Sequence, residues 1–312
     1  MKTLFIFLAA LIIISAVSFV YLPSLNTPFQ FDDVKRIVGQ APVENMDLAG
    51  IFQYSKTRPL VYLTLALNYY FDGYNVFGYH LINLLIHIIS SLVVFALGLI
   101  VFNSPRLKNQ SLSQHSSMLA FFSSMIFALH PLQTESVTYV WQRAESMTGM
   151  FYLLAIFLYA KFRLSDAGRS GKKTGFLLYA ACILSIILCS FTKPNSVTLP
   201  VAILLFEVCF LSRSVKDFRR SLRYLAPVLL FILLPVALAK FDIEESKSSS
   251  MRFTSYYMPY YYTKLRILAN SLRLMFMPFN QTIEYDFAWS ASLVNPISTL
   301  YSAIILLSLA LI

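Results

Sequence analysis

Apolar stretches long enough to cross a lipid bilayer recur along this chain of 312 residues. A membrane-spanning helix needs about 20 mostly apolar residues, because each residue adds about 1.5 Å to its length. Hydrophobic residues make up 57% of the sequence and charged residues only 13%, whereas soluble domains have about 50% and 25%. The sequence therefore predicts an all-α, polytopic transmembrane bundle. We expect about eight spans, at residues 3–22, 78–102, 117–130, 146–162, 175–191, 195–211, 222–240 and 296–312.

The first apolar run, residues 3–22, follows a basic start, as a secretory signal peptide does. The run is long, however, and no clear small-x-small cleavage site precedes the polar segment that follows. We favour a retained first helix, with a cleaved signal peptide as the alternative.

The net charge of +10 is spread in a way that indicates membrane topology. Basic residues cluster in the short segments 103–116, 161–174 and 212–221, whose only acids are Asp166 and Asp217. The segment 23–77 contains five acids. Because Lys and Arg favour cytoplasmic loops, we expect a cytoplasmic N-terminus and no nucleic-acid partner. Bacterial inner membrane and endoplasmic reticulum both fit this pattern.

Three cysteines lie inside apolar runs, at Cys182, Cys189 and Cys209. Their spacing matches no zinc or redox motif. We expect them to be small buried side chains and not a disulfide framework.

Two adjacent carboxylates, Asp32 and Asp33, follow the first span almost at once. In an extended segment successive side chains point in opposite directions, so one acid would face a reacting centre while the other holds the loop or a ligand. A partly desolvated carboxylate has a raised proton affinity, which suits a general base. An acidic helix cap before VKRIV is the alternative.

Residues 58–73 predict a helix on the outer surface with Arg58 at its start. Arg58 is either a phosphate ligand or a solvated interfacial arginine. In the next helix His80 shares a face with Asn83, His87 and Ser90. Such polar faces line a cavity or form hydrogen bonds between helices, and both interpretations stay open.

The segment ALHPLQTESVTYVWQRAES is rich in polar side chains. His130 ends a span, and Glu135, Tyr139 and Gln142 follow at helical spacing, with Arg143 close to the same face. An acid, a hydroxyl, an amide and a guanidinium in one cleft suit sugar hydroxyls and phosphate oxygens. The alternative is an interfacial helix anchored by an aromatic belt.

Two further cations lie at predicted outer membrane ends. Lys193 follows a span, and Arg273 lies on the basic face of an amphipathic helix predicted over residues 261–279. Each suits a lipid phosphate, although a snorkelling lysine and general attraction to anionic lipids explain them nearly as well.

The motifs together are more specific than any one of them. FDD, RPL, GYHLINLLIH, FALHPLQTESVTYVWQRAE, KP and LRLMFMPFNQTIEYDF occur in this order between residues 20 and 290. This arrangement resembles the membrane portion of the tetratricopeptide-repeat O-mannosyltransferase-like proteins, which are polytopic glycosyltransferases of the C superfamily. The block HPLQTESVTYVWQRAE is its strongest element.

The resemblance implies a C-type glycosyltransferase fold and a polyprenyl-phosphate sugar as donor, with membrane lipid around it. The acceptor would be a hydroxyl of a protein or a lipid-linked molecule on the non-cytoplasmic side. Asp32 or Asp33 would be the catalytic base, and the outer segments 23–77 and 241–295 would form the active site. The assigned phosphate ligands are Arg58, Arg143, Lys193 and Arg273, and the cavity residues are His80, His130, Glu135, Tyr139 and Gln142.

No second nucleophile is evident, so an inverting transfer is expected. The two acids lack the intervening residue of a DxD motif, which favours a reaction without a metal or other cofactor. A divalent cation at Asp32 and Asp33 stays open.

The chain departs from the family pattern in two respects, because no tetratricopeptide repeats follow the spans and the later spans of the family are missing. We expect one glycosyltransferase-like domain over residues 1–312, truncated at its C-terminus. A transporter or flippase of a lipid-linked sugar and a non-catalytic scaffold are the rival functions. A transporter predicts inverted repeats, and the sequence contains no convincing one.

Overall fold

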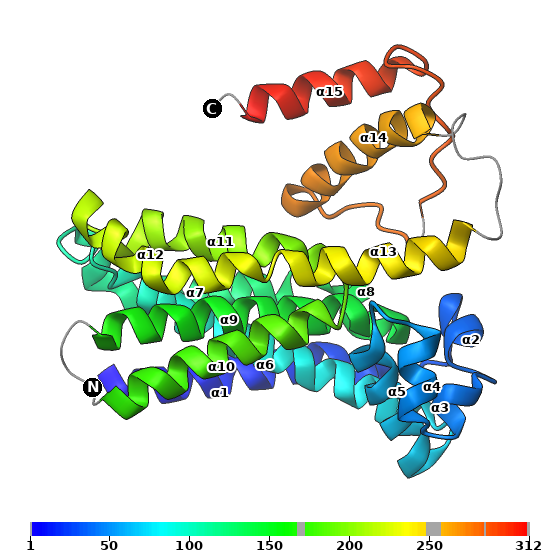
Figure 1. Cartoon of the computed structure of the whole chain (residues 1–312), viewed down its shortest axis with the longest axis horizontal. Helices are drawn as coiled ribbons and strands as arrows, with labels where there is room; N and C mark the ends of the chain where they lie inside the picture. The colour runs from blue at the N-terminus through cyan, green and yellow to red at the C-terminus, as the bar shows by residue number, and fades with distance from the viewer. Residues whose placement is uncertain (1, 167–171, 248–256, 284, 311–312) are drawn as a thin grey trace. The chain divides into compact units, whose positions relative to one another are not determined.

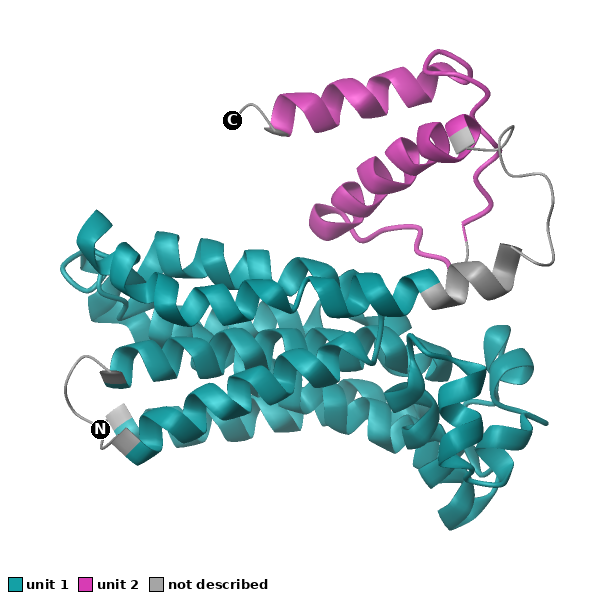
Figure 2. Cartoon of the chain, viewed as in Figure 1, with its two compact units in different colours: residues 1–242 teal, residues 243–312 magenta. Residues whose placement is uncertain are grey.

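The computed structural model describes residues 2–166, 172–247, 257–283 and 285–310. Within these ranges the chain forms helices and no strands, which confirms the all-α class. It divides into two compact units, residues 1–242 and 243–312, which are described separately (Figure 2).

Six helical segments of the described chain are long and apolar enough to cross a membrane, as a multi-pass protein requires. The helices that carry them are α1 (Lys2–Tyr21), α6 (Val76–Phe102), α9 (Arg143–Asp166), α10 (Lys172–Ser190), α11 (Leu199–Phe206), α12 (Val215–Leu230) and α13 (Leu233–Lys247). The α11 segment is extended by the short helices η4 (Pro194–Thr198) and η5 (Glu207–Leu211), and α12 and α13 together make one segment.

The other two predicted spans are shorter helices of 14 residues each, α7 (Ser116–Leu129) and α15 (Ile297–Ala310). The count of eight spans is therefore not confirmed. The α7 helix ends where Pro131 disfavours helical geometry in the residue before it. His130 accordingly has the extended backbone angles φ −64° and ψ 128°.

Short helices form a layer at one end of unit 1, opposite the start of α1 (Figure 1). Pro59 sits in the first turn of the longest of them, where its missing N–H costs nothing. That helix buries Val61, Tyr62 and Leu65 and leaves Tyr70 exposed. The layer comprises α2 (Asp32–Arg36), α3 (Ala41–Glu44), α4 (Leu48–Tyr54) and α5 (Pro59–Asp72). The short helices α8 (Gln133–Thr138) and η3 (Val140–Gln142) lie nearby. Two further short helices of unit 1 are η1 (Leu22–Asn26), which follows α1, and η2 (Ser111–His115), which precedes α7.

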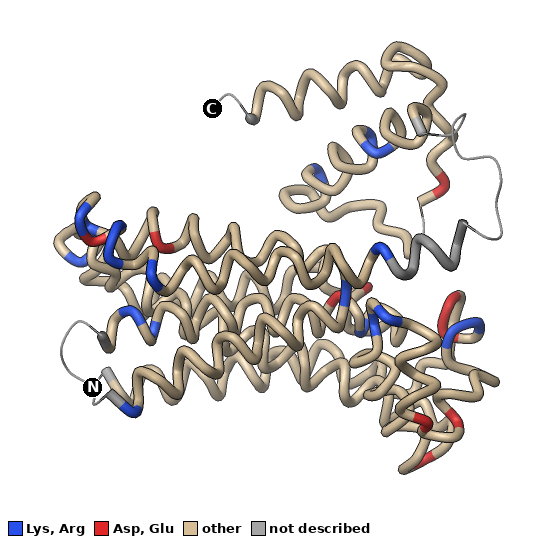
Figure 3. The backbone as a smooth tube through the Cα atoms, viewed as in Figure 1, with Lys and Arg blue, Asp and Glu red and all other residues tan. Residues whose placement is uncertain are grey.

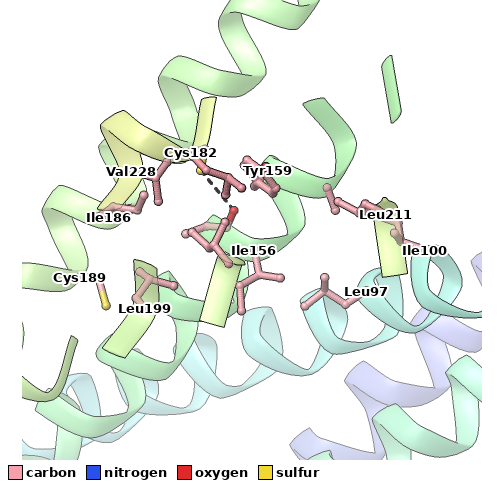
Figure 4. Close-up of a cluster of buried hydrophobic side chains, with 14 of the residues drawn as sticks. Leu97, Ile100, Ile156, Tyr159, Cys182, Ile186, Cys189, Leu199, Leu211 and Val228 are labelled. Carbon is pink, nitrogen blue, oxygen red and sulfur yellow. Dashed lines mark hydrogen bonds between the residues drawn. The ribbon is translucent and has the colours of Figure 1, made fainter. Parts of the chain in front are cut away.

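A buried apolar cluster joins the long helices of unit 1 (Figure 4). Leu97 of α6, Ile156 of α9, Ile186 of α10, Leu199 of α11 and Val228 of α12 all belong to it. A second cluster joins α1, α6 and α7, and a third lies beneath the short helices. The short helices and the adjoining ends of α1, α6 and α7 are therefore held in place by buried apolar side chains.

The cysteine prediction is only partly correct. Cys182 and Cys189 are buried, and the Cys182 thiol donates to the Ala155 carbonyl at 3.4 Å (Figure 4). Cys209, in the π-helix η5, is exposed.

The two ends of unit 1 differ in charge (Figure 3). The basic loops gather near the start of α1, where the Arg106 Nε donates to the Ser212 carbonyl at 2.8 Å. Most acids of unit 1 lie at the opposite end, among the short helices. The described parts of the loops that the sequence assigned to one side of a membrane therefore lie at one end of the bundle, while residues 167–171 of the second loop lie outside the described residues.

One ion pair of unit 1 is buried at the basic end. Arg163 of α9 donates from Nε and Nη2 to the Glu207 carboxylate of η5 at 3.0 and 2.9 Å. Tyr159 and Ser212 donate to the same carboxylate at 3.0 and 2.6 Å. A carboxylate with no exposed side-chain area is tolerated here because four hydrogen bonds satisfy it.

Unit 2 contains α14 (Tyr257–Phe276) and α15. The Thr263 hydroxyl accepts a hydrogen bond from the Ser290 amide at 2.9 Å, which ties α14 to the segment before α15. Thr299 of α15 donates to the Ser290 hydroxyl at 2.9 Å.

Candidate functional site

The acid pair lies at the start of a helix, which corrects the expected extended conformation. Asp32 and Asp33 form the first turn of α2. Successive helical side chains still diverge, so the two carboxylates have different surroundings. Asp33 is 2% exposed, whereas Asp32 is half-buried.

The Asp33 carboxylate holds two segments of backbone in place. Its Oδ1 accepts from the Trp141 amide at 2.7 Å, and its Oδ2 accepts from the Gln30 amide at 3.2 Å. The second contact reaches back three residues, as in a capping box. Neither acid is the N-cap residue of α2, because Phe31 occupies that position and forms no side-chain cap. Burial raises its pKa from 3.8 to about 6, although the hydrogen bonds from Gln30 and Trp141 lower it in part.

Asp32 is held through its backbone and not through its carboxylate. Its amide donates to the Tyr139 hydroxyl at 2.9 Å. Within the described ranges no hydrogen bond to the Asp32 carboxylate is formed. Tyr139, predicted as a cavity residue, is 7% exposed and acts here as a support for the acid pair.

Arg143 is fully buried at the start of α9. Nε donates to the Asn83 Oδ1 at 2.8 Å, and Nη2 donates to the Tyr79 carbonyl at 2.8 Å. Nη1 donates to Asn68 and Thr64 at 2.7 and 3.2 Å. The guanidinium has no exposed surface and four of its five N–H groups donate to these acceptors, so its assigned phosphate contact stays a prediction.

Asn83 links Arg143 back to the acid pair. Its side-chain amide donates to the Tyr139 carbonyl at 3.3 Å, so the polar face of α6 holds the turn between α8 and α9. On the same face His87 lies 2.9 Å from the Ala128 carbonyl, and His80 lies 2.8 Å from the Thr27 carbonyl. The interpretation as hydrogen bonds between segments is confirmed for these groups. His80 is 2% exposed and does not line an open cavity in this conformation.

A second polar group surrounds the start of η4. Lys193 forms a salt bridge with Glu145, a residue that the sequence did not single out. Asn195 donates to the Glu145 carboxylate at 3.4 Å, and Gln142 donates to Glu135 at 2.8 Å. Burial raises the pKa of Glu135. The Nδ1 of His130 accepts from the Leu132 amide at 3.1 Å.

Arg58 lies close to Trp141, as does a second arginine that sequence reasoning missed. The guanidinium carbons of Arg58 and Arg36 are 5.6 and 5.9 Å from the centroid of the Trp141 ring, within cation–π range. Arg36 lies four residues after Asp32, on the same short helix. That i, i+4 spacing could have indicated from the sequence that Arg36 shares a helix face with Asp32.

Arg273 belongs to unit 2 and is described there. Its Nε and Nη2 donate to the Asn270 side chain at 3.1 and 3.0 Å, and Nη1 donates to the Phe279 carbonyl at 3.2 Å. Its proposed phosphate role stays a prediction.

Curated proteins with sequences similar to this chain are protein O-mannosyl-transferases. The protein O-mannosyl-transferase Tmtc3 of Drosophila melanogaster is 33% identical over 165 residues, which is 48% of this chain and 17% of that protein. The protein O-mannosyl-transferase F38B6.6 of Caenorhabditis elegans is 29% identical over 208 residues, 62% of this chain and 27% of the relative. Human TMTC3 is 31% identical over 169 residues, 50% of this chain and 17% of the relative.

The chain is similar to the TMTC protein O-mannosyl-transferases. This confirms the resemblance stated on the motifs. No family model and no solved structure matches the chain. The chain spans only about a sixth to a quarter of the length of the relatives named here, so their activity is a proposal for this protein.

Proposed function

We propose that this protein is a membrane glycosyltransferase, which moves a mannose-like hexose from a polyprenyl-phosphate sugar to a hydroxyl on the non-cytoplasmic side. The acceptor is a hydroxyl of a protein. The observation that carries the proposal is the fixed position of the acid pair at one end of the bundle, in a chain whose sequence is similar to TMTC proteins. The Tyr139 hydroxyl and the Trp141 amide hold Asp32 and Asp33 at 2.9 and 2.7 Å.

The two acids have different roles in this proposal. Asp32 is the general base, because its carboxylate is half-exposed and engaged in no described hydrogen bond. Asp33 is a positioning residue, since both of its oxygens hold backbone amides. A base must lie within hydrogen-bond reach of the proton that it takes, and only the Asp32 carboxylate has open surface for an acceptor.

The chemistry is a single displacement at the anomeric carbon. Asp32 takes the proton of the acceptor hydroxyl as its oxygen forms a bond to that carbon. The bond from the anomeric carbon to the phosphate oxygen breaks, and the polyprenyl phosphate leaves with the electron pair. Cationic side chains stabilise the phosphate anion, so no strong general acid is needed. Attack from the face opposite the phosphate inverts the anomeric centre.

The test is transfer of labelled mannose from polyprenyl-phosphate mannose to a serine- and threonine-containing acceptor, in membranes that contain the chain. Wild type is compared with Asp32→Asn and with Asp47→Asn, an exposed acid of the same segment that caps α4. We expect Asp32→Asn to lower the rate at least about 100-fold, as loss of a general base does. Asp47→Asn retains most of the activity. Equal rates in all three proteins would refute the assignment of Asp32, and no transfer by wild type would refute the enzyme.

A further inference from the structure

The cations that the sequence assigned to a donor phosphate are not equally available in the structure. Arg143 is fully buried and four of its five N–H groups donate inside the protein, and Lys193 is paired with Glu145. Arg58 and Arg36 differ, because within the described part of the chain neither guanidinium donates a hydrogen bond or joins a salt bridge. Their described contacts are with the face of Trp141, and a cation–π contact consumes no N–H group.

The surroundings of these two arginines favour an anion. Both guanidiniums lower the pKa of the Tyr62 hydroxyl, although burial raises that pKa overall, so their positive fields overlap at one point. Two like charges near one indole repel each other, and an anion between them relieves that repulsion. Guanidinium groups bind phosphate through paired N–H donors, which makes a phosphate the best match.

Trp141 connects this positive site to the acid pair. Its amide donates to Asp33 at 2.7 Å, while its ring contacts Arg36 and Arg58. Arg36 also lies on the same short helix as Asp32. A phosphate bound by the arginines would therefore lie close to the proposed base, as a leaving group must.

An apolar cavity lies between α4, α5 and the end of α10. It has a volume of about 170 Å³, and Phe52, Leu60 and Phe191 are among its lining residues. Pro59, which also lines it, follows Arg58 directly in the chain. A ligand that contacts both regions has a phosphate head and an apolar chain.

We propose that Arg36 and Arg58 bind the phosphate of a single-chain isoprenyl phosphate, with the start of its chain in the apolar cavity beside Pro59. This inference rests on the proposed function, because the ligand is the donor lipid of that reaction. It adds Arg36 to the site and removes Arg143 from the phosphate ligands.

Direct binding tests the site without any transfer reaction. Purified protein in lipid nanodiscs is titrated with farnesyl phosphate, with farnesol and with inorganic phosphate, using wild type, Arg36→Gln, Arg58→Gln and the double variant. Lys35→Gln is the matched control, since it removes one exposed positive charge from the neighbouring position of α2. Elution volume and thermal stability establish that each variant is folded.

We expect each arginine variant to weaken farnesyl phosphate binding about 10-fold or more, and Lys35→Gln less than about 2-fold. Farnesol should bind equally to all variants, and inorganic phosphate should bind more weakly than farnesyl phosphate. Equal affinity of wild type and the double variant would overturn the arginine site. Equal affinity of wild type for inorganic and farnesyl phosphate would overturn the role of the cavity.

The outcomes separate this inference from the proposed function. If binding depends on the arginines but wild type transfers no sugar, the site stands and the proposed function fails. If the double variant transfers sugar with an unchanged KM for the donor, the function stands and the arginine site fails.

Discussion

Asp33 shows at the scale of one residue how burial changes the chemistry of a carboxyl group. Its folded pKa of about 6 exceeds its ordinary value of 3.8, so the native state binds the proton more tightly than the unfolded state does. Stability from this group is therefore present below about pH 4 and is lost as pH rises to about 6. We expect the apparent Tm of wild type to fall across this interval relative to that of Asp33→Asn, as measured by thermal unfolding in detergent. Parallel Tm profiles would show that Asp33 is not the titrating group.

Arg143 is the residue whose replacement should cost most stability in the site. Lysine keeps the charge, but its single ammonium cannot reach Asn83, Asn68 and the Tyr79 carbonyl together. Each buried group left unsatisfied costs about 1–3 kcal/mol. We expect Arg143→Lys to lower the apparent Tm by roughly 5 °C or more. Arg36→Lys is the control, because Arg36 is exposed and should shift Tm little; similar shifts in both variants would contradict the structural role of Arg143.

The π-helix η5 illustrates how an element gains a fixed partner. It presents Glu207 to Arg163 of α9, and the Glu207 side chain has no exposed area once the helices pack. Removal of one member of a buried pair typically costs about 3–5 kcal/mol, whereas apolar replacement of both costs much less. We expect Arg163→Met to destabilise the protein strongly and Arg163→Met/Glu207→Met to recover much of the loss. A thermal-unfolding double-mutant cycle measures this, and additive losses would show that the two groups do not interact.

At the scale of the whole molecule, the charge difference between the two ends of unit 1 predicts its orientation in a membrane. Asn45 and Gln114 are exposed; Asn45 lies between α3 and α4 in the layer of short helices, and Gln114 lies in η2, in the basic segment between α6 and α7 at the other end (Figure 1). In a background without the native cysteines, we expect Asn45→Cys to react with an impermeant maleimide from the non-cytoplasmic side and Gln114→Cys only after permeabilisation. The reverse labelling would invert the orientation and place the acid pair in the cytoplasm.

Much of this architecture was determined by the sequence itself. The cost of an unsatisfied backbone in lipid forces long apolar runs into helices, so six helical segments of spanning length were predictable. The polar face of α6 was also predictable, because Asn83 and His87 lie at helical spacing and polar groups in spans form hydrogen bonds with neighbouring segments. The order of the motifs predicted the similarity to TMTC proteins.

Only the tertiary structure decided what the individual polar side chains do. Spacing places Asp32 and Asp33 side by side, but packing against the turn at Trp141 buries one carboxylate and leaves the other half-exposed. The fold likewise surrounds Arg143 with acceptors from α5 and α6 and brings Arg36 and Arg58 to one indole. These differences arise because hydrogen-bond partners and burial come from segments far apart in the chain, and local pattern contains no information about which segments meet.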